Sequence, residues 1–592
     1  METKNWLTRD GDNQRAERGN TNNEYVTLSY CWGPPVSEDF TLQTWNYEEF
    51  SKGFAVGRLP QTLRDAVHFA ARLESVGYIW IDALCIVQNS KEDWAQQSVQ
   101  MDQIYEETYL NLSAAAPSDK KGGLYRHRNP ALLKTEEVLL NTRGIPNAIP
   151  ESNNSALVVS GADWAVSPTR ATLDKYLRHN SDVEFLRTCT VLEVNYWSRR
   201  VDQAPVNKRG WVFQERCLSP RVLHFCEDQI AWECQGIRGC RGFTACEKQP
   251  NGLTNCYLTE NDLRIAPRQS WTTDINGLDV GVEASGHINE SSVARYNKSD
   301  FAGSAAAKYR KPDIRLDTAA MQLWARTVEA YSQKALTQPQ DRLIALAGFA
   351  KLMAKRLNSR YAAGLWENDL EHQLLWYVDP EFNHRTRIFS QRAVVPREHC
   401  APTFSWAAVD VTGYGLIYAD SSFPRTYIKI KNCHVELREP TRRFGLLNGA
   451  HITMWCKLRQ ATLHTAENGR FCWYLFARDD ELNHEAPKNV YLDCYERDKA
   501  YIDNLQREVY VVPVAIDQSF DMICLILRLH DEEKGIFQRI GLTKLTSFMD
   551  RMAMSAREPH VEHKILEVLP GDISLPHAGF DIEERLHMIH LT

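Results

Sequence analysis

The sequence has no long apolar run and no excess of positive charge. Residues 1–20 are polar and charged throughout and lack the apolar core of a signal peptide. No segment reaches the roughly 20 apolar residues that span a bilayer, since the apolar stretch 509–516 is short and contains Pro513. A formal net charge of -7 provides no broad basic surface for nucleic acid. We therefore expect a soluble, cytoplasmic protein with no membrane span and no nucleic-acid partner.

Cysteine is frequent but is not arranged for disulfides or for zinc. The fifteen cysteines are odd in number, and without a secretory signal we expect reduced, mostly buried thiols. The densest group contains no CxxC pair and consists of Cys217, Cys226, Cys234, Cys240, Cys246 and Cys256. His224 lies within it, but the spacings are wider than in a zinc knuckle. We favour packed thiols and assign no metal ligand; a metal site is the open alternative.

The motifs of three enzyme classes are also missing. The chain has no GxGxxG or Walker sequence to support a Rossmann dehydrogenase or a P-loop NTPase. It has no GxSxG elbow, and no set of Ser, His and Asp can be assembled from local pattern. Any enzymatic chemistry must therefore come from another arrangement of residues.

Residues 24–114 alternate between strand and helix patterns. The segments are a strand at 24–30, a helix opened by Pro60 and closed by Gly77, a strand at 78–82, a helix at 91–107 and a strand at 109–114. Such alternation is typical of a parallel α/β sheet with right-handed crossovers. Farther on, 210–216 starts a helix, and 222–225 with 229–232 form a hairpin.

The whole chain of 592 residues is too long for one core, because domains typically hold roughly 100–200 residues. We expect a polar N-terminal tail at 1–23, an α/β domain at 24–246 with an insertion at about 115–195, a loop or linker at 247–312, a helical segment at 313–385 and a β-rich C-terminal domain at 386–592.

Three segments together resemble the heterokaryon incompatibility (HET) domain of filamentous fungi. They are 25–33 (YVTLSYCWG), 59–105 and 209–221 (RGWVFQERCLSPR), and their combination in this order is specific. The family is tied to vegetative incompatibility, in which the fusion of unlike hyphae triggers death. The resemblance therefore implies a role in fungal self/non-self recognition and regulated cell death.

The HET domain is in turn regarded as a distant relative of TIR domains, which are flavodoxin-like and some of which cleave NAD. The resemblance implies a TIR/flavodoxin-like parallel sheet. Many TIR domains carry a Trp followed four residues later by a Glu poised over the nicotinamide ribose, and Trp211 and Glu215 match this spacing. The sequence departs from the pattern at Lys208, where a serine often stands. NAD is thus the expected substrate, and no prosthetic group is implied.

Cleavage of a glycosidic bond needs a carboxylate beside an oxocarbenium-like transition state. Glu215 is our first candidate and Asp82, at the end of a buried strand, is the second. Ligands of open α/β sheets bind outside the carboxyl ends of strands. Trp32 and Gly33 follow another strand end, and Gly33 would let a ribose or phosphate approach the backbone. These two residues, with Arg209 and Trp211, make up the expected nucleotide-binding set.

Each candidate also has a structural interpretation. Glu215 could pair with Arg209 or Arg221, and Asp82 could cap the turn after its strand. Trp80 is favoured as a core residue over a cofactor-stacking one. The alternative function is a non-catalytic signalling module that self-associates through the HET domain, with the β-rich domain as the sensor or interaction surface.

Overall fold

A computed structural model describes residues 7–8, 24–34, 40–128, 136–141, 186–191, 197–234 and 316–378, then 381–545 with several gaps, and 570–592. These residues fall into two compact units, and each is described by itself. The first unit comprises Met1–Gln97, Gln103–Lys208 and Ser219–Gly303, and the second comprises Ser98–Asp102, Arg209–Leu218 and Ser304–Thr592. The predicted linker at 247–312 and most of the predicted tail and insertion lie outside the described residues.

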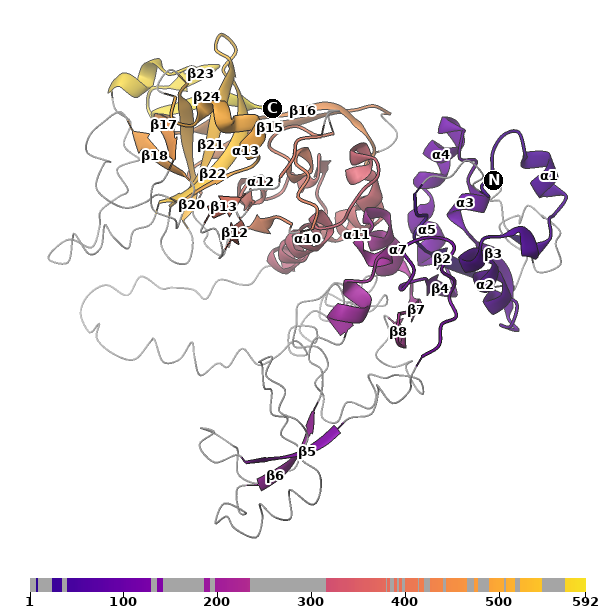
Figure 1. The fold of residues 1–592 in the computed structure, drawn as a ribbon. Helices are drawn as coiled ribbons and strands as arrows, with labels where there is room; N and C mark the ends of the chain where they lie inside the picture. Colours follow the sequence, from indigo (N-terminus) through magenta and orange to yellow (C-terminus); the bar gives the residue numbers. More distant parts are fainter. Residues whose placement is uncertain are drawn as a thin grey trace. The chain divides into compact units, whose positions relative to one another are not determined.

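The first unit contains a six-stranded sheet in the order β1-β3-β2-β4-β7-β8, of which Figure 1 labels β2, β3, β4, β7 and β8. Its strands are β1 (Leu7–Thr8), β2 (Glu24–Ser29), β3 (Val76–Trp80), β4 (Leu110–Ser113), β7 (Arg221–Phe225) and β8 (Ile230–Cys234). The four central strands β3, β2, β4 and β7 are parallel, and the edge strands β1 and β8 run antiparallel to their neighbours. The predicted parallel α/β sheet and the predicted hairpin are confirmed.

Helices of the first unit occupy the connections between these strands. They are α1 (Tyr47–Ser51), α2 (Gln61–Ala70), α3 (Asp82–Cys85), α4 (Lys91–Ser98) and α5 (Met101–Glu106), with π-helical residues Ser198–Asp202 and a 3-10 turn at Val206–Lys208. Leu63, Ala66 and Ala70 of α2 recur at helical spacing and are buried against Val26 and Leu28 of β2. Their burial is the apolar core that holds the helix on the sheet. Trp80 is 1% exposed, which confirms it as a core residue.

One prediction about these helices is wrong, and a second is confirmed only in part. Gly77 was predicted to end the first helix as a left-handed cap. Instead α2 ends at Ala70, its C-cap Ala71 is right-handed, and Gly77 belongs to β3. The predicted helix at 91–107 is interrupted between α4 and α5. There the carbonyl oxygen of Val99 accepts a hydrogen bond from the Lys351 ammonium at 3.0 Å. Both residues belong to the second unit, and a partner 252 positions away is invisible to local sequence periodicity.

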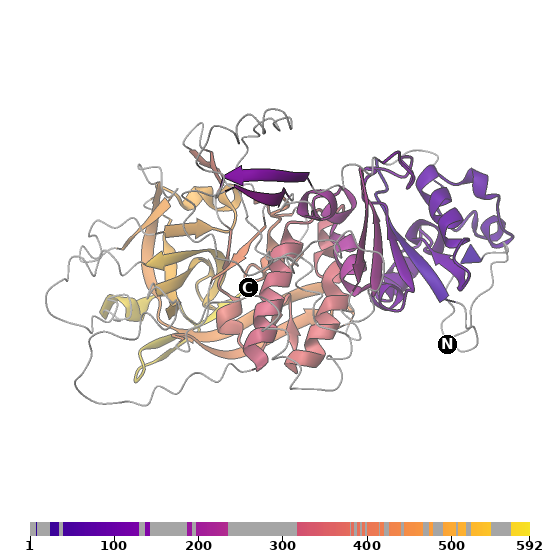
Figure 2. The same cartoon turned by 90° about the horizontal axis from the view of Figure 1, so that it is seen from below.

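The helical part of the second unit contains α7 (Gly210–Leu218), α10 (Leu316–Ser332), α11 (Ala347–Leu357) and the short helix α12 (Leu370–Gln373). The helices α10 and α11 pack side by side (Figure 2). Short hairpins follow, built from β9 (Tyr361–Ala362), β10 (Leu365–Trp366), β11 (Trp376–Tyr377), β12 (Glu381–Asn383), β13 (Ile388–Ser390) and β14 (Ile417–Tyr418).

The first unit also contains an antiparallel hairpin, β5 (Glu136–Asn141) with β6 (Leu186–Val191), which lies within the predicted insertion.

The rest of the second unit is rich in β-structure, as predicted. A ten-stranded sheet has the path β15-β16-β24-β22-β21-β20-β17-β18, with β19 paired to β22 and β23 paired to β24. Its strands are β15 (Lys429–Leu437), β16 (Leu447–Cys456), β17 (Arg459–Thr465), β18 (Trp473–Ala477), β19 (Asn489–Leu492), β20 (Val509–Ile516), β21 (Met522–Asp531), β22 (Ile536–Leu545), β23 (Gly579–Asp581) and β24 (Leu586–Leu591). None of the helices that the structure describes has both the length and the apolar character of a membrane span.

Candidate functional site

The carboxyl ends of β3, β2, β4 and β7 meet at one edge of the first unit's sheet, because these four strands are parallel. The loop after β2 carries Trp32 and Gly33, and β3 is followed by Ile81 and by Asp82, the first residue of α3. Ligands of open α/β sheets bind at this edge, so the structure places three of the predicted site residues where such a ligand would lie.

Trp32 and Asp82 contact each other directly. The indole Nε1 of Trp32 donates to Oδ2 of Asp82 at 2.9 Å, and the ring of Trp32 stacks on Tyr30 at 6.4 Å between centroids. The other oxygen, Oδ1 of Asp82, accepts the backbone N–H of Ala83 at 2.7 Å. This second contact is local, because Asp82 is the first residue of α3 and the N-cap Ile81 makes no side-chain capping bond. The carboxylate therefore positions Trp32 and binds the backbone at the start of α3.

Gly33 is needed for the path of its loop. Its φ of 77° lies in the left-handed region, which a side chain disfavours. A Cβ atom on Gly33 would lie 2.6 Å from Cβ of Asp119, in the loop that follows β4. The Asp119 side chain thus occupies the space beside Gly33 that the sequence interpretation assigned to a ribose or phosphate. The two loops that follow the adjacent strands β2 and β4 are consequently in contact.

The other predicted site residues lie in the second unit, on or beside α7. Arg209 forms a parallel bridge with Ala335, and the N–H of Gly210 donates to the Ala335 carbonyl at 2.7 Å. The indole Nε1 of Trp211 donates to Oδ2 of Asp341 at 3.2 Å. Burial raises the pKa of the Asp341 carboxyl, and this hydrogen bond opposes the rise.

Glu215 is 4% exposed, one turn after Trp211 on the same helix. The neighbouring residue Gln214 is anchored as well, since its side-chain oxygen accepts the N–H of Gly348 at 3.3 Å. α7 is therefore held at several points by the second unit, and the predicted helix start at Gly210 is confirmed. The structure brings Trp32 together with Asp82, and it places Trp211 and Glu215 on one helix.

A row of buried polar side chains in the first unit escaped the sequence analysis. Its members are Thr27 and Ser29 on β2, Asn111 and Ser113 on β4, His224 on β7 and Glu233 on β8, all at most 7% exposed. Thr27, Ser29 and Asn111 share hydrogen bonds of 3.2 Å, and Nε2 of His224 lies 2.9 Å from Oε2 of Glu233. The strand pairing puts Ser29, Ser113 and His224 side by side near the carboxyl edge.

The signal for this row was present in the sequence. Polar residues alternate with apolar ones in β2 and β4, a pattern that indicates one face in water and one in the core. The structure buries both faces, so the alternation marks a polar interior instead. A histidine paired with a glutamate is an arrangement suited to general base chemistry. In this structure the His224 side chain is 0% exposed.

Among the residues that the structure describes, the cysteines mostly follow the prediction of reduced thiols. Cys217 and Cys226 are buried thiols, whereas Cys234 is disulfide-bonded, so the prediction is wrong at that position. Burial raises the pKa of the Cys85 thiol to about 12, which removes its nucleophilic character near neutral pH. Within the described ranges no group of His, Cys, Asp or Glu side chains is arranged to hold a metal ion. Cys240, Cys246 and Cys256 lie outside those ranges.

The hydrogen bond between Trp32 and Asp82 gives a first testable expectation. Replacing Trp32 by phenylalanine keeps an aromatic ring but removes the donor, and a hydrogen bond to a charged acceptor contributes about 1.5–3 kcal/mol. In urea denaturation we expect Trp32→Phe and Asp82→Ala each to lower the free energy of unfolding. The double variant should show a coupling of about 1 kcal/mol. Strictly additive effects would contradict the contact.

The fold and the edge contacts define an α/β domain with a parallel sheet and a polar site at its carboxyl edge. Residues 25–215 match the family model described as heterokaryon incompatibility protein (HET). The chain therefore carries a HET domain, and the resemblance identified from the sequence is confirmed. The match begins in β2 and ends at Glu215 of α7. No curated protein and no solved structure matches the chain.

Proposed function

We propose that this protein is an effector of fungal self/non-self recognition that triggers regulated cell death by cleaving NAD. The HET domain suggests the heterokaryon incompatibility role. The death response and the cleavage of NAD go beyond this family match and are our proposal. The observation that carries the NAD chemistry is that Trp211 and Glu215 lie one turn apart on α7, the spacing expected from the TIR resemblance.

The order of the parallel strands supports a ligand site at this place. Counted along the chain, the parallel strands are β2 (first), β3 (second), β4 (third) and β7 (fourth). Across the sheet they lie in the order β3, β2, β4, β7, which is second, first, third, fourth. Flavodoxin-like sheets begin with the same order, and they bind their ligand where the winding reverses, between the first and third strands. In this domain that position is where the loops after β2 and β4 meet, beside Trp32, so a ligand there requires the Asp119 side chain to move away from Gly33.

The chemistry requires few groups. The bond between the nicotinamide nitrogen and C1′ of the ribose breaks, and positive charge develops on the ribose. Water then adds to C1′, so that nicotinamide, ADP-ribose and a proton are released. A carboxylate stabilises such a charge and orients the water. We assign this role to Glu215, on the TIR-like spacing of Trp211 and Glu215 along α7. Within the first unit, Asp82 holds Trp32 in place.

The proposal is tested by inducible expression of the chain in a filamentous fungus. Hyphal viability and total NAD are measured over time for the wild type and for Glu215→Gln, with protein levels matched by immunoblot. We expect the wild type to deplete NAD before cells die and the variant to do neither. Death without NAD loss, or an equal response to both forms, would refute NAD cleavage as the cause.

One observation favours the second candidate, a non-catalytic module that self-associates. Trp45, which precedes α1 in the HET domain, is 77% exposed. Tryptophan is among the residues that most often dominate the binding energy of protein interfaces, and exposure of so large an apolar ring costs free energy in water. On this hypothesis the ring is an anchor between two copies of the domain.

Replacing Trp45 by serine is expected to weaken self-association by at least about tenfold, as the loss of one central aromatic anchor does. Sedimentation velocity over a concentration series measures the dissociation constant. Ile582, which is 82% exposed in the second unit, provides the matched control as Ile582→Ser. Equal association of the wild type and Trp45→Ser would remove Trp45 from the interface.

A further inference from the structure

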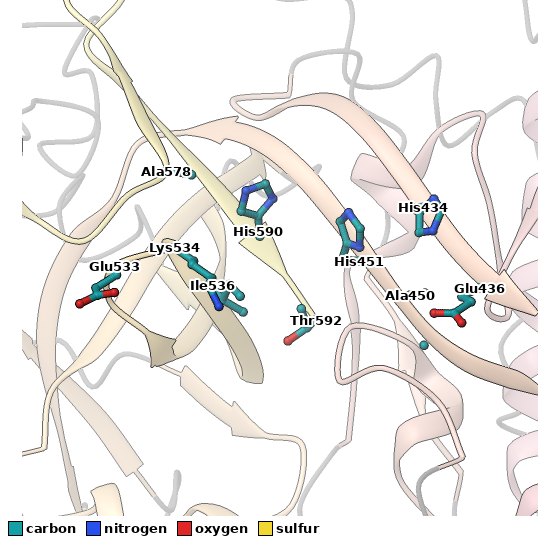
Figure 3. A pocket seen from close by; sticks show the side chains of 11 residues that line it. His434, Glu436, Ala450, His451, Glu533, Lys534, Ile536, Ala578, His590 and Thr592 are labelled. Carbon is teal, nitrogen blue, oxygen red and sulfur yellow. The ribbon is translucent and has the colours of Figure 1, made fainter.

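A pocket of about 570 Å³ lies in the second unit, outside the HET domain (Figure 3). Its floor is formed by β15, β16 and β24, and the turn between β21 and β22 forms another side. Small-molecule sites in proteins typically have volumes of about 300–1,000 Å³. The pocket is therefore large enough for a metabolite.

Three histidines line the pocket on adjacent strands, as Figure 3 shows. His434 of β15 pairs directly with His451 of β16, and their ring centroids are 5.2 Å apart. The ring of His590 of β24 lies 6.0 Å from that of His451, and its Nδ1 is 2.9 Å from the hydroxyl oxygen of Thr453. The rings of His434 and His451 form no hydrogen bond with any residue that the structure describes.

The charged groups around these rings have both signs. Lys534, in the turn between β21 and β22, is 71% exposed and forms a long ion pair with Asp531 at 3.4 Å. Glu436 of β15 and Glu533 of the same turn supply carboxylates. The pKa of His451 is lowered, first by burial and then by the neighbouring rings of His434 and His590. A negative charge placed between the rings would reverse this effect, because it stabilises the imidazolium form.

We propose that this pocket binds a small phosphorylated molecule that carries hydroxyl groups, and that it takes up protons as the molecule binds. Imidazole N–H groups and an ammonium donate to phosphate oxygens, and charge-assisted bonds of this kind are strong. The carboxylate of Glu436 accepts hydrogen bonds from hydroxyl groups. A sugar phosphate offers both features, and phosphate alone would leave most of the volume empty.

A substitution at Gly449 can fill the pocket and leave the three histidine rings unchanged. It is the cross-strand partner of Glu436, and a Cβ atom on it would meet no atom within 4 Å. Its φ lies outside the left-handed region, so a side chain is compatible with the strand. A phenylalanine there suits a β-strand and would project into the pocket. The site is independent of the HET-domain chemistry proposed above.

The test is isothermal titration calorimetry of the full chain with ribose 5-phosphate and, separately, with ribose. We expect ribose 5-phosphate to bind at least about tenfold more tightly at pH 6 than at pH 8, because imidazoles protonate in this range. Buffers of different ionisation enthalpy should report net proton uptake. No binding of ribose 5-phosphate at pH 6, or equal binding of ribose, would overturn the proposal.

Variants locate the binding. Gly449→Phe should abolish it, and His451→Gln should weaken it and reduce the proton uptake. His464→Gln is the matched control, since His464 lies on β17 and does not line the pocket. Circular dichroism and thermal melting show whether each variant is folded. If a folded Gly449→Phe and a folded His451→Gln both bind like the wild type, the pocket is not the site.

Discussion

Replacing Arg539 by alanine is expected to destabilise the second unit by about 3–5 kcal/mol, because it leaves the buried Asp493 carboxylate without its nearer partner, while Arg497 lies 4.0 Å away. The Arg539 side chain is 0% exposed and lies 3.7 Å above the ring of Trp376. Its Nε and Nη2 each lie 3.1 Å from an oxygen of Asp493. The guanidinium also donates to the carbonyls of Leu374 and Trp376. Burial lowers the pKa of Arg539, and the Asp493 carboxylate opposes that shift.

Urea denaturation followed by circular dichroism measures this loss. The control is Arg443→Ala, since Arg443 is exposed and its removal should change the free energy of unfolding by at most about 0.5 kcal/mol. A double variant, Arg539→Met with Asp493→Leu, removes both charges and should recover part of the stability. A single Arg539→Ala variant as stable as the control would show that this group does not hold the second unit together.

Glu215→Gln is expected to reduce the turnover of NAD by about 10²–10⁴-fold, the range in which one positioned acid–base group acts. Glutamine has nearly the shape of glutamate, so the packing around a side chain that is 4% exposed should persist. The expected loss is in kcat, with the KM for NAD little changed, because the carboxylate acts on the transition state.

The matched control is Glu48→Gln, a change of the same kind on α1, where Glu48 is exposed. It should leave both kinetic parameters unchanged. Asp82→Asn should have a smaller effect than Glu215→Gln, since Asp82 acts through Trp32. Equal turnover by the wild type and a folded Glu215→Gln would remove Glu215 from the proposed site and leave it with a packing role.

Local pattern predicted the parallel strands of the HET domain and the helix α2 between them. β-branched and aromatic runs marked β2, β3 and β4, and the strand–helix alternation predicted their parallel pairing. Parallel pairing also implies that Trp32 and Asp82 stand at the same edge. Their hydrogen bond joins residues 50 positions apart and required the structure.

The failures of prediction share a physical cause, which is long-range contact. Local periodicity made the helix at 91–107 continuous, whereas in the structure it is interrupted where the Val99 carbonyl accepts a hydrogen bond from Lys351. The polar row that contains Asn111 and His224 is buried because both faces of the sheet are covered. The pocket histidines come from three strands and meet only through the register of the sheet. No short window of sequence contains these relations.

NAD cleavage by the wild-type chain is the proposal that most needs a test. The most direct measurement is the release of nicotinamide, followed by chromatography, from NAD incubated with the purified full chain. The dilute protein and a form clustered through a fused oligomeric tag should both be assayed, because assembly shifts such equilibria. We predict stoichiometric release of nicotinamide and ADP-ribose, faster in the clustered form. No release in either form would contradict the account.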